Sequence, residues 1–289
     1  MYKLITIDLD GTLFNSYGEV SEGNREAIKY ALDKGIKVVL ASGRDPKIIE
    51  KISLDLGIND FLISGNGASV YSIKDKKNIY ESYIKKEYAL KIIELCKKNS
   101  IFLNIYTTRG IIAESINYNV KVFNSENNYR PKNKQTNIEI VKNIKEYIEN
   151  TDLEILKIII CDENKIIFDN VMQKFKQINE IEVLEVEHMS KKIIKIGTEE
   201  KLIEYYYTEI TNENTNKWSA LEFLINKLKI KKEDVICIGD NLNDEKMVNN
   251  AGLGIVMKNS ALSSKKIGDF VTDTNNEDGV KKAIYRFIN

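Results

Sequence analysis

Apolar runs and amphipathic segments alternate along the first part of the chain. The runs at 2–8, 36–40 and 61–63 are rich in Ile, Leu and Val and predict short strands. Between them, 22–34 and 46–56 place apolar residues at helical spacing and predict two helices. This alternation of strand and helix predicts a parallel sheet with helices on both of its faces.

Two local signals refine this picture. Ser21 stands directly before the first amphipathic segment and is predicted to cap that helix. The turn sequence Gly65-Asn66-Gly67, followed by Ser69-Val70-Tyr71, predicts a hairpin appended to the sheet.

The pattern changes at residue 83, where strands linked by short turns become more frequent. Residues 119–136 are polar and rich in Asn, and they predict a loop. The predicted helices are 87–98, 138–149 and 169–178, and the predicted strands are 102–106, 111–113, 155–161, 181–186, 193–197 and 203–210. Together they indicate an α+β layer that is separate from the first sheet.

Strand and helix alternate again in the last part of the chain. The predicted elements are helix 218–228, strand 235–238, helix 244–249, strands 253–256 and 270–271, and helix 277–287. We therefore expect one α/β domain, 1–82 with 206–289, and an inserted α+β domain, 83–205.

Composition narrows the classes of function. Lys and Arg number 43, as do Asp and Glu, and this balance argues against nucleic acid as the partner. No apolar run reaches membrane-spanning length, and no signal peptide is evident. The three cysteines are far apart and are expected to be buried thiols. We expect a cytoplasmic protein that does not bind membranes.

The chain has a single histidine, His188, and no Gly-x-Ser-x-Gly motif accompanies it. A surface or loop position is the better interpretation of this residue. Any acid–base chemistry then falls to carboxylates.

Chemically useful residues follow three of the predicted parallel strands. Asp8-Leu9-Asp10 ends the first strand, Ser42-Gly43-Arg44 follows the second, and Gly239-Asp240 ends a late strand. Lys217 precedes a helix and could enter the same crevice. Because ligands bind at the carboxyl ends of parallel strands, these residues predict one common site.

The residue types suggest phosphoryl transfer. Asp8 would attack phosphorus as the nucleophile, and Asp10 would act as the acid and base. Two anions so close together, about 1 kcal/mol unfavourable at 4 Å in water, suggest a Mg²⁺ site. Asp240, with water and Asp244, would complete or orient the Mg²⁺ coordination.

Several groups could bind the phosphate. The Ser42 hydroxyl and the backbone amides of Leu9 and Gly43 could donate hydrogen bonds to its oxygens. Lys217 would neutralise the charge of the transition state. Each motif alone could equally be an ordinary turn or a helix cap, and the combination favours a site.

Four stretches together resemble the motifs of the haloacid dehalogenase-like hydrolase superfamily. They are Asp8-Leu9-Asp10-Gly11-Thr12, Ser42-Gly43-Arg44, Lys217 and Gly239-Asp240-Asn241-Leu242-Asn243-Asp244. The insertion after the second motif and Gly65-Asn66-Gly67-Ala68 are similar to the Cof-type branch of sugar-phosphate and related phosphatases. The resemblance covers nearly the whole chain and implies a Rossmann-like core with an inserted cap domain.

The resemblance also implies roles for single residues. It implies that Asp8, the main-chain carbonyl of Asp10 and Asp240 hold Mg²⁺, with Asp244 supporting the metal. The residues that it implies for phosphate binding are Leu9, Ser42, Gly43, Lys217 and Asn243.

Two stretches depart from the branch's pattern. Trp218 stands where the branch usually has glycine. The stretch 188–207 is longer than the final strands of the cap require, which an extra hairpin would explain.

We therefore expect a Mg²⁺-dependent phosphatase that acts on small phosphorylated metabolites as a monomer or weak dimer. A phosphomutase on the same site is the nearest alternative. A non-enzymatic phosphoacceptor that resembles a response-regulator receiver is a second alternative, although a receiver predicts no inserted cap.

Overall fold

A computed structural model describes residues 1–132, 135–184, 189–196 and 199–288. The chain divides into two compact units, Met1–Ser82 with Thr215–Asn289, and Tyr83–Asn214. The predicted second boundary, between 205 and 206, lies inside a strand that the structure extends over Glu199–Asn212. This strand belongs to the second unit as a whole, because its last residues pair there with another strand.

The first unit is built on an eight-stranded sheet in the order β15-β14-β13-β1-β2-β3-β4-β5. All neighbours from β15 to β3 are parallel, and β4 and β5 extend the sheet in antiparallel fashion. The strands are β1 (Leu4–Asp8), β2 (Lys37–Ala41), β3 (Phe61–Ser64), β4 (Ser69–Ser72), β5 (Lys77–Glu81), β13 (Val235–Gly239), β14 (Leu253–Val256) and β15 (Phe270–Val271). The predicted parallel sheet and its appended hairpin are confirmed.

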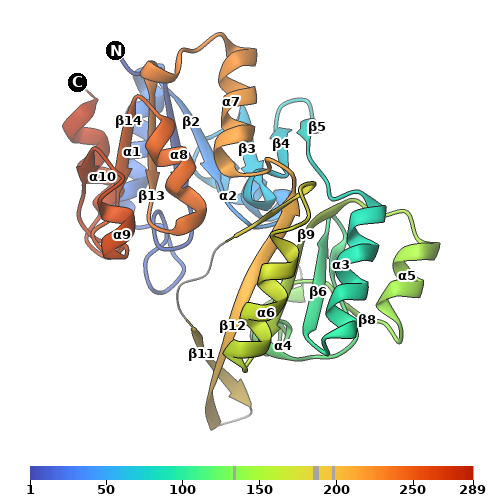
Figure 1. The fold of residues 1–289 in the computed structure, drawn as a ribbon. Helices are drawn as coiled ribbons and strands as arrows, with labels where there is room; N and C mark the ends of the chain where they lie inside the picture. Colours follow the sequence, from blue (N-terminus) through green and yellow to red (C-terminus); the bar gives the residue numbers. More distant parts are fainter. Residues whose placement is uncertain (133–134, 185–188, 197–198, 289) are drawn as a thin grey trace. The chain divides into compact units, whose positions relative to one another are not determined.

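Helices cover both faces of this sheet, as Figure 1 shows. The helices are α1 (Glu22–Asp33), α2 (Pro46–Asp55), α7 (Lys217–Leu228), α8 (Glu245–Asn250), α9 (Leu262–Lys265) and α10 (Gly279–Phe287). Short 3₁₀ turns add η1 (Gly65–Gly67), η3 (Lys232–Asp234) and η4 (Leu242–Asp244).

The strand β1 shows how the two faces are filled. Ile5 and Ile7 belong to one buried cluster, which includes residues of α1, α2 and α10. Leu4 belongs to a second cluster, which includes residues of α7 and α8. Because successive side chains of a strand point to opposite faces, the burial of every residue from Leu4 to Asp8 fits a sheet covered on both sides. Ser21 caps α1 as predicted, since its hydroxyl accepts a hydrogen bond from the Asn24 amide at 3.1 Å.

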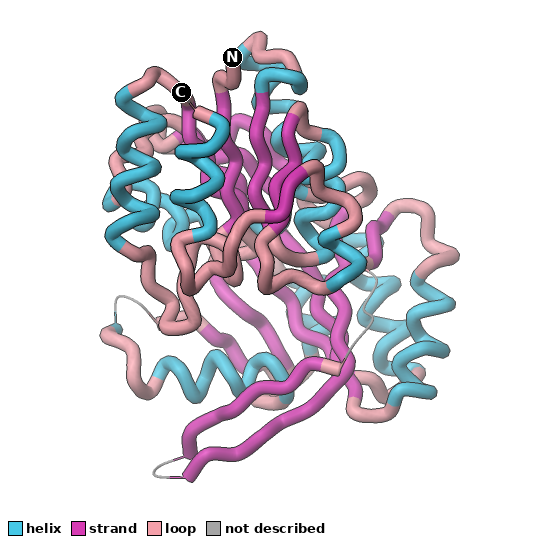
Figure 2. The backbone as a smooth tube through the Cα atoms, turned by 90° about the vertical axis from the view of Figure 1, so that its left-hand side faces the viewer, coloured by secondary structure: helices cyan, strands magenta, loops and turns pink. Residues whose placement is uncertain are grey.

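The second unit is built on a sheet in the order β10-β12-β9-β6-β7-β8, and β11 pairs with β12. Figure 2 shows the strands of this unit in magenta and its helices in cyan. Its strands are β6 (Phe102–Thr107), β7 (Gly110–Ala113), β8 (Ile138–Ile140), β9 (Ile155–Asp162), β10 (Ile181–Val183), β11 (Ser190–Ile196) and β12 (Glu199–Asn212). Its helices are α3 (Lys86–Lys98), α4 (Tyr118–Asn127), α5 (Ile144–Asn150) and α6 (Lys165–Phe175).

Three predictions for the second unit differ from the structure. The predicted loop contains α4, whose Val120 is buried and whose Asn119 exchanges hydrogen bonds with Asn104. The predicted helix 138–149 begins as the strand β8, because its first residues pair with β7. The helix α6 begins before residue 169, since the Asn164 side chain accepts hydrogen bonds from the first amides of that helix.

The long strand β12 explains the extended stretch noticed in the sequence. Its first half pairs with β11 over Ser190–Ile196, which forms the expected extra hairpin. His188 and the end of the predicted strand 181–186 lie outside the described residues.

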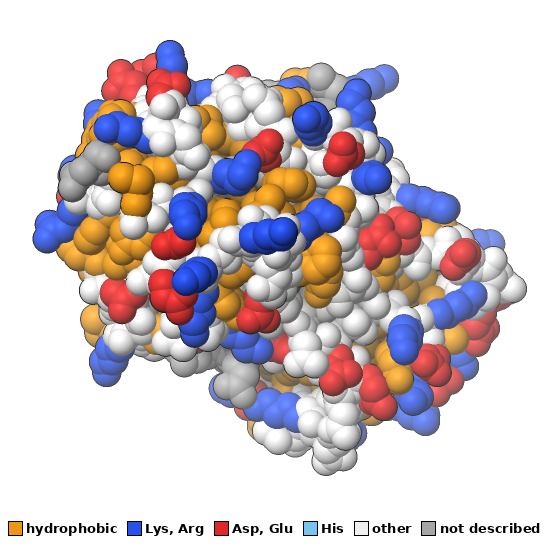
Figure 3. Space-filling model, turned by 90° about the horizontal axis from the view of Figure 1, so that it is seen from above, with side chains coloured by type: hydrophobic (Ala, Val, Ile, Leu, Met, Phe, Trp, Pro, Cys, Tyr) orange, Lys and Arg blue, Asp and Glu red, His pale blue; other side chains and the backbone are white. Residues whose placement is uncertain are grey.

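The surface agrees with the balanced composition. Figure 3 shows Lys and Arg side chains interspersed with Asp and Glu on the face that it draws. In the described part of the chain, no helix is both long enough and apolar enough to cross a membrane. All three cysteines are free and buried, as expected.

Candidate active site

The site lies in the first unit, where three adjacent parallel strands end. In the sheet, β1 lies between β13 and β2, and all three run in the same direction. Asp8 is the last residue of β1, Ser42 follows β2, and Asp240 follows β13. The carboxyl ends of these strands therefore bring together residues that are far apart in the sequence.

Three carboxylates gather at this edge. One oxygen each of Asp8, Asp240 and Asp244 lies within 4.8 Å of the others. Asp8 and Asp244 are buried, with 5% and 1% of their surface exposed, whereas Asp240 is half-buried. Carboxylate oxygens at this spacing are the ligands that Mg²⁺ takes in proteins.

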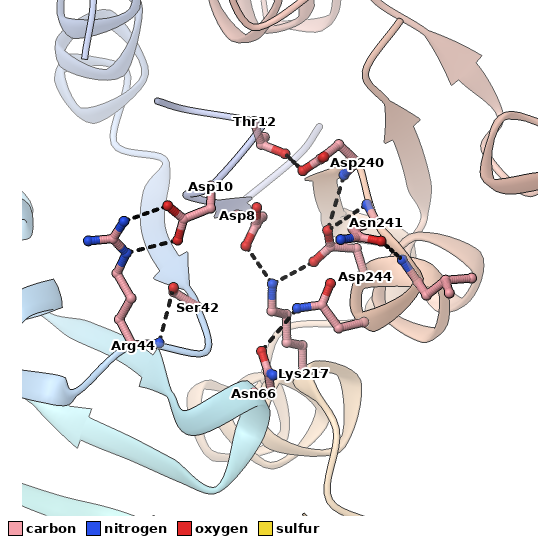
Figure 4. Close-up of polar contacts among 12 residues, drawn as sticks. Asp8, Asp10, Thr12, Ser42, Arg44, Asn66, Lys217, Asp240, Asn241 and Asp244 are labelled. Atoms are coloured by element: carbon pink, nitrogen blue, oxygen red, sulfur yellow. Dashed lines mark hydrogen bonds and ion pairs between the residues drawn. The ribbon is translucent and has the colours of Figure 1, made fainter. Parts of the chain in front are cut away.

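Lys217 is fully buried among these carboxylates. Its Nζ lies 2.5 Å from Oδ1 of Asp8 and 2.6 Å from Oδ1 of Asp244 (Figure 4). The lysine is the first residue of α7, and that helix start is fixed by a capping box between Asn216 and Ser219. One ammonium thus contacts two of the three carboxylates, which leaves an excess of negative charge in the cluster.

The crowding of charge shifts the titration of these groups. Burial, with the carboxylate of Asp244, raises the pKa of Asp8 well above its usual range, although Lys217 opposes the shift. Burial and Asp244 also raise the pKa of Asp240 to about 6. Burial alone would lower the pKa of Lys217, but the nearby Asp244 and Asp8 outweigh it and raise that pKa. A cation beside the carboxylates would relieve their mutual repulsion.

Asp244 also holds the loop that follows β13. Its Oδ2 accepts hydrogen bonds from the backbone amides of Asp240 and Asn241, both at 3.1 Å. A Cβ atom at Gly239 would overlap the side chain of Asp244, so this approach needs glycine. Asp244 stands at the start of α8, but its side chain makes no capping bond to that helix, so an ordinary helix cap does not account for this residue.

Thr12 connects the first acidic motif to the last one. Its Oγ1 donates a hydrogen bond to Oδ1 of Asp240 at 2.8 Å. Gly11 has a φ of +86°, and a Cβ atom there would overlap the Asp240 carboxylate. The turn after β1 therefore shapes the position of Asp240, a role that the sequence analysis did not assign to Thr12.

Asp10 points away from the three carboxylates, toward Arg44 (Figure 4). Arg44 binds it with two hydrogen bonds, from Nε at 2.8 Å and from Nη2 at 2.5 Å. The guanidinium of Arg44 also lies over the ring of Phe14, 5.3 Å from its centre. The partner of Asp10 was not foreseen, although Arg44 lies in one of the recognised motifs.

The predicted phosphate-binding residues lie in the loops around this cluster. Ser42 is buried, and its Oγ accepts a hydrogen bond from the Arg44 amide at 3.3 Å. Leu9 is buried at the end of β1. Asn243 donates a hydrogen bond from Nδ2 to Oδ1 of Asn66 at 3.0 Å.

Gly43 lies close to the side-chain amide of Asn66. A Cβ atom at Gly43 would be 2.9 Å from Oδ1 of Asn66. The sequence analysis placed Asn66 in a turn and in the stretch Gly65-Asn66-Gly67-Ala68 that is similar to the Cof-type branch, but it gave this residue no role in the site. Its place between two glycines is typical of tight turns whatever their function.

Comparison with known proteins gives a consistent family. The family model of haloacid dehalogenase-like hydrolases matches residues 5–284. The 5-amino-6-(5-phospho-D-ribitylamino)uracil phosphatase YcsE of Bacillus subtilis is 30% identical over 290 residues, which cover 99% of this chain and 96% of the relative. The phosphatase YwpJ of Bacillus subtilis is 30% identical over 289 residues, covering 96% of this chain and 97% of the relative.

Solved structures agree with this result. A haloacid dehalogenase-like hydrolase from Bacteroides thetaiotaomicron superposes with a TM-score of 0.78 at 29% identity, and each chain is covered completely. The subclass IIB sugar phosphatase BT4131 shares the fold, with a TM-score of 0.77 at 23% identity over 99% of this chain and 98% of the neighbour.

These matches confirm the predicted α/β fold and the predicted class of enzyme, a phosphoric monoester hydrolase. The chain belongs to the haloacid dehalogenase-like hydrolase family.

Proposed function

We propose that this protein is a Mg²⁺-dependent phosphatase that hydrolyses small phosphorylated metabolites through an aspartyl-phosphate intermediate. The observation that carries the proposal is the position of Asp8. It is a buried carboxylate at the end of a central strand, bound by Lys217 and beside two further carboxylates. Such a group is placed to attack a phosphate that enters from the sheet edge.

The reaction has two balanced steps. An oxygen of Asp8 forms a bond to phosphorus while the bond from phosphorus to the ester oxygen breaks, and Asp10 gives that oxygen a proton. Asp10 then removes a proton from water, the water oxygen bonds to phosphorus, and the bond between phosphorus and Asp8 breaks. Inorganic phosphate leaves, and both aspartates return to their first state.

Asp10 must turn for this role. In the structure its carboxylate is held by Arg44, and 57% of its side chain is exposed. An ion pair that is open to water is readily exchanged. The pair therefore permits Asp10 to rotate toward the leaving oxygen when a substrate is bound.

The three carboxylates fit a divalent cation, since their oxygen atoms are close together and carry an excess of negative charge over Lys217. Asp8, Asp240 and the main-chain carbonyl of Asp10 would hold Mg²⁺, with Asp244 supporting them. When bound, the ion would offset the repulsion between Asp8 and the phosphate.

The phosphate oxygens would be bound by groups that surround the cluster. The proposed donors are the backbone amides of Leu9 and Gly43, the Ser42 hydroxyl, the Asn243 amide and Lys217. The ammonium of Lys217 has three hydrogens, and its two carboxylate contacts leave one for a phosphate oxygen.

Relatives suggest where to look for the substrate. YcsE and YwtE of Bacillus subtilis are named as phosphatases of 5-amino-6-(5-phospho-D-ribitylamino)uracil. We propose that the second unit, Tyr83–Asn214, acts as a cap that selects the leaving group. A screen of this compound, sugar phosphates, nucleotides and pyridoxal phosphate, reported as kcat/KM, identifies the preferred class.

Replacement of Asp8 tests the mechanism. We expect Asp8→Asn to abolish Mg²⁺-dependent hydrolysis of 4-nitrophenyl phosphate, because an amide cannot form the phosphoenzyme. Asp33→Asn, at an exposed position of α1, is the matched control and should keep full activity. Turnover that survives in Asp8→Asn would contradict the aspartyl-phosphate route.

A further inference from the structure

The turn η1 (Gly65–Gly67) joins two strands of the sheet, yet it also contacts two loops and one helix start that carry candidate site residues. At its centre, Asn66 has a left-handed backbone (φ 57°, ψ 33°) and is buried, with 8% of its surface exposed. Asparagine adopts this conformation more readily than most residues, and a buried side-chain amide requires hydrogen-bond partners.

The first contact is with Asn243. Oδ1 of Asn66 accepts a hydrogen bond from Nδ2 of Asn243 at 3.0 Å. An amide nitrogen carries two hydrogens in one plane, so a bond to one of them fixes the direction of the other. The second hydrogen of Asn243 remains for a phosphate oxygen.

The second contact is with the loop after β2. The backbone N–H of Asn66 donates a hydrogen bond to the carbonyl of Ser42 at 3.1 Å, and the backbone N–H of Gly65 donates one to the carbonyl of Arg44 at 3.2 Å. The missing side chain of Gly43 makes room for the Asn66 amide group. The backbone that presents the Ser42 hydroxyl and the Gly43 amide is therefore tied to the turn.

The third contact is with the start of α7. Gly67 has a φ of +101°, and a Cβ atom there would overlap the backbone of Asn216 and Lys217. Figure 4 shows Asn66 close to Lys217 on the same side of the cluster. The turn thus meets the loop of Ser42, the loop of Asn243 and the helix start of Lys217.

We propose that Asn66 is a positioning residue that aims the Asn243 amide at the substrate phosphate. This inference rests on the proposed phosphatase function. It assigns Asn66 no contact with the reacting atoms. It predicts that the Asn66 side chain affects phosphate binding through Asn243 and leaves the chemical step nearly unchanged.

The test is a double-mutant cycle with Asn66→Gly, Asn243→Ala and the double variant. Glycine keeps the left-handed backbone and removes only the side-chain amide, so the variant reports the effect of the Asn66 side chain alone. We expect Asn66→Gly to raise KM for 4-nitrophenyl phosphate and Ki for inorganic phosphate by roughly 3- to 10-fold, with kcat within about twofold. The double variant should bind phosphate no more weakly than Asn243→Ala alone.

Lys229→Gly is the matched control. Lys229 has nearly the same backbone conformation (φ 56°, ψ 36°) but is exposed at the end of α7. Its replacement should leave KM, Ki and kcat unchanged.

Gly43→Ala probes the same contact from the opposite side and serves if Asn66→Gly fails to fold. Its Cβ would press on Oδ1 of Asn66, so the part of its loss of phosphate affinity that runs through Asn66 should disappear in the Asn243→Ala background. The part that comes from the Gly43 amide itself should remain. Fully additive losses in either cycle, or unchanged KM and Ki in Asn66→Gly, would overturn the positioning role. A wild-type protein without Mg²⁺-dependent phosphatase activity would instead overturn the proposed function.

Discussion

The Oγ1 atom of Thr12 donates a hydrogen bond to Oδ1 of Asp240 at 2.8 Å and so joins two acidic motifs that are 228 positions apart in the chain. The bond occupies one oxygen of Asp240 and orients the carboxylate within the group that it forms with Asp8 and Asp244. A neutral donor thereby holds an anionic group in place without adding charge to the cluster.

Removal of this donor should weaken metal binding. In Thr12→Val the carboxylate of Asp240 loses its orienting bond, and we expect the Mg²⁺ concentration for half-maximal activity to rise roughly tenfold. Thr12→Ser keeps the hydroxyl and should stay close to the wild type. Titration of activity and of heat release with Mg²⁺ measures both variants, and equal Mg²⁺ affinity in Thr12→Val and Thr12→Ser would contradict the role.

Loss of Lys217 should cost both activity and stability. In Lys217→Met the buried Asp8 and Asp244 lose their shared cation, and removal of one partner of a buried ion pair costs about 3–5 kcal/mol. We expect an inactive protein whose unfolding in urea shifts to lower concentration. Lys227→Met, exposed on the same helix, is the control, and an equal effect of the two replacements would rule out this explanation.

Gly11 and Gly18 form a natural pair for separating backbone strain from overlap. Both have positive φ, +86° and +77°, so alanine at either position is strained. A Cβ atom at Gly11 would overlap the Asp240 carboxylate, whereas nothing lies within 4 Å of one at Gly18. We expect kcat/KM of Gly11→Ala to be roughly tenfold or more below that of Gly18→Ala. The loss of thermal stability should be similar in the two variants, because both place alanine at a positive φ. Equal kcat/KM in the two variants would show that Asp240 tolerates the added methyl group.

The metal-free protein should become less stable as pH rises through the titration of Asp240. Its pKa is raised to about 6 from an ordinary 3.8, so between these values the folded state binds more protons than the unfolded state. The contribution of Asp240 to the free energy of unfolding therefore falls from pH 4 to pH 6 and stays low above it. Asp240→Asn removes this contribution.

Thermal unfolding in a chelator checks this sign. The Tm of Asp240→Asn minus that of the wild type should grow between pH 5 and pH 7, by roughly 2–4 °C for each 1 kcal/mol regained. Added Mg²⁺ should raise the Tm of the wild type more at pH 7 than at pH 5 and should have little effect on the variant. A Tm difference that shrinks with rising pH would contradict the raised pKa.

The first unit could be predicted well from the sequence because its strands are apolar on both faces. The run from Leu4 to Ile7 contains a single polar residue, Thr6, and its end at Asp8 is abrupt. Parallel strands then require a common edge for their carboxyl ends, which is why residues near 8, 42 and 240 could be expected together. The structure brings these residues together at one edge.

The second unit was harder because tertiary contacts outweigh local preference there. The helix α4 contains six polar residues among ten besides Tyr118, and its buried Asn119 exchanges hydrogen bonds with Asn104 of β6. Such a partner is invisible in a local window of sequence. The strand β8 is three residues long and exists through its pairing with β7.

Side-chain pairings within the site were also beyond the sequence. The bond between Asn66 and Asn243 and the ion pair between Asp10 and Arg44 join residues from different loops. The types of residue were recognisable, but which of them meet depends on loop conformations that residue type alone does not determine.

The pairing of β1 with β13 has a consequence for synthesis on the ribosome. Leu4 pairs with Val235, so one edge of β1 stays unpaired until the ribosome has synthesised the whole of Tyr83–Asn214 and then β13. That intervening stretch is continuous in sequence and can acquire its own core while the edge of β1 is still open. We expect the nascent chain to need protection along β1 until β13 emerges, because an apolar strand with an unpaired edge readily pairs with other chains.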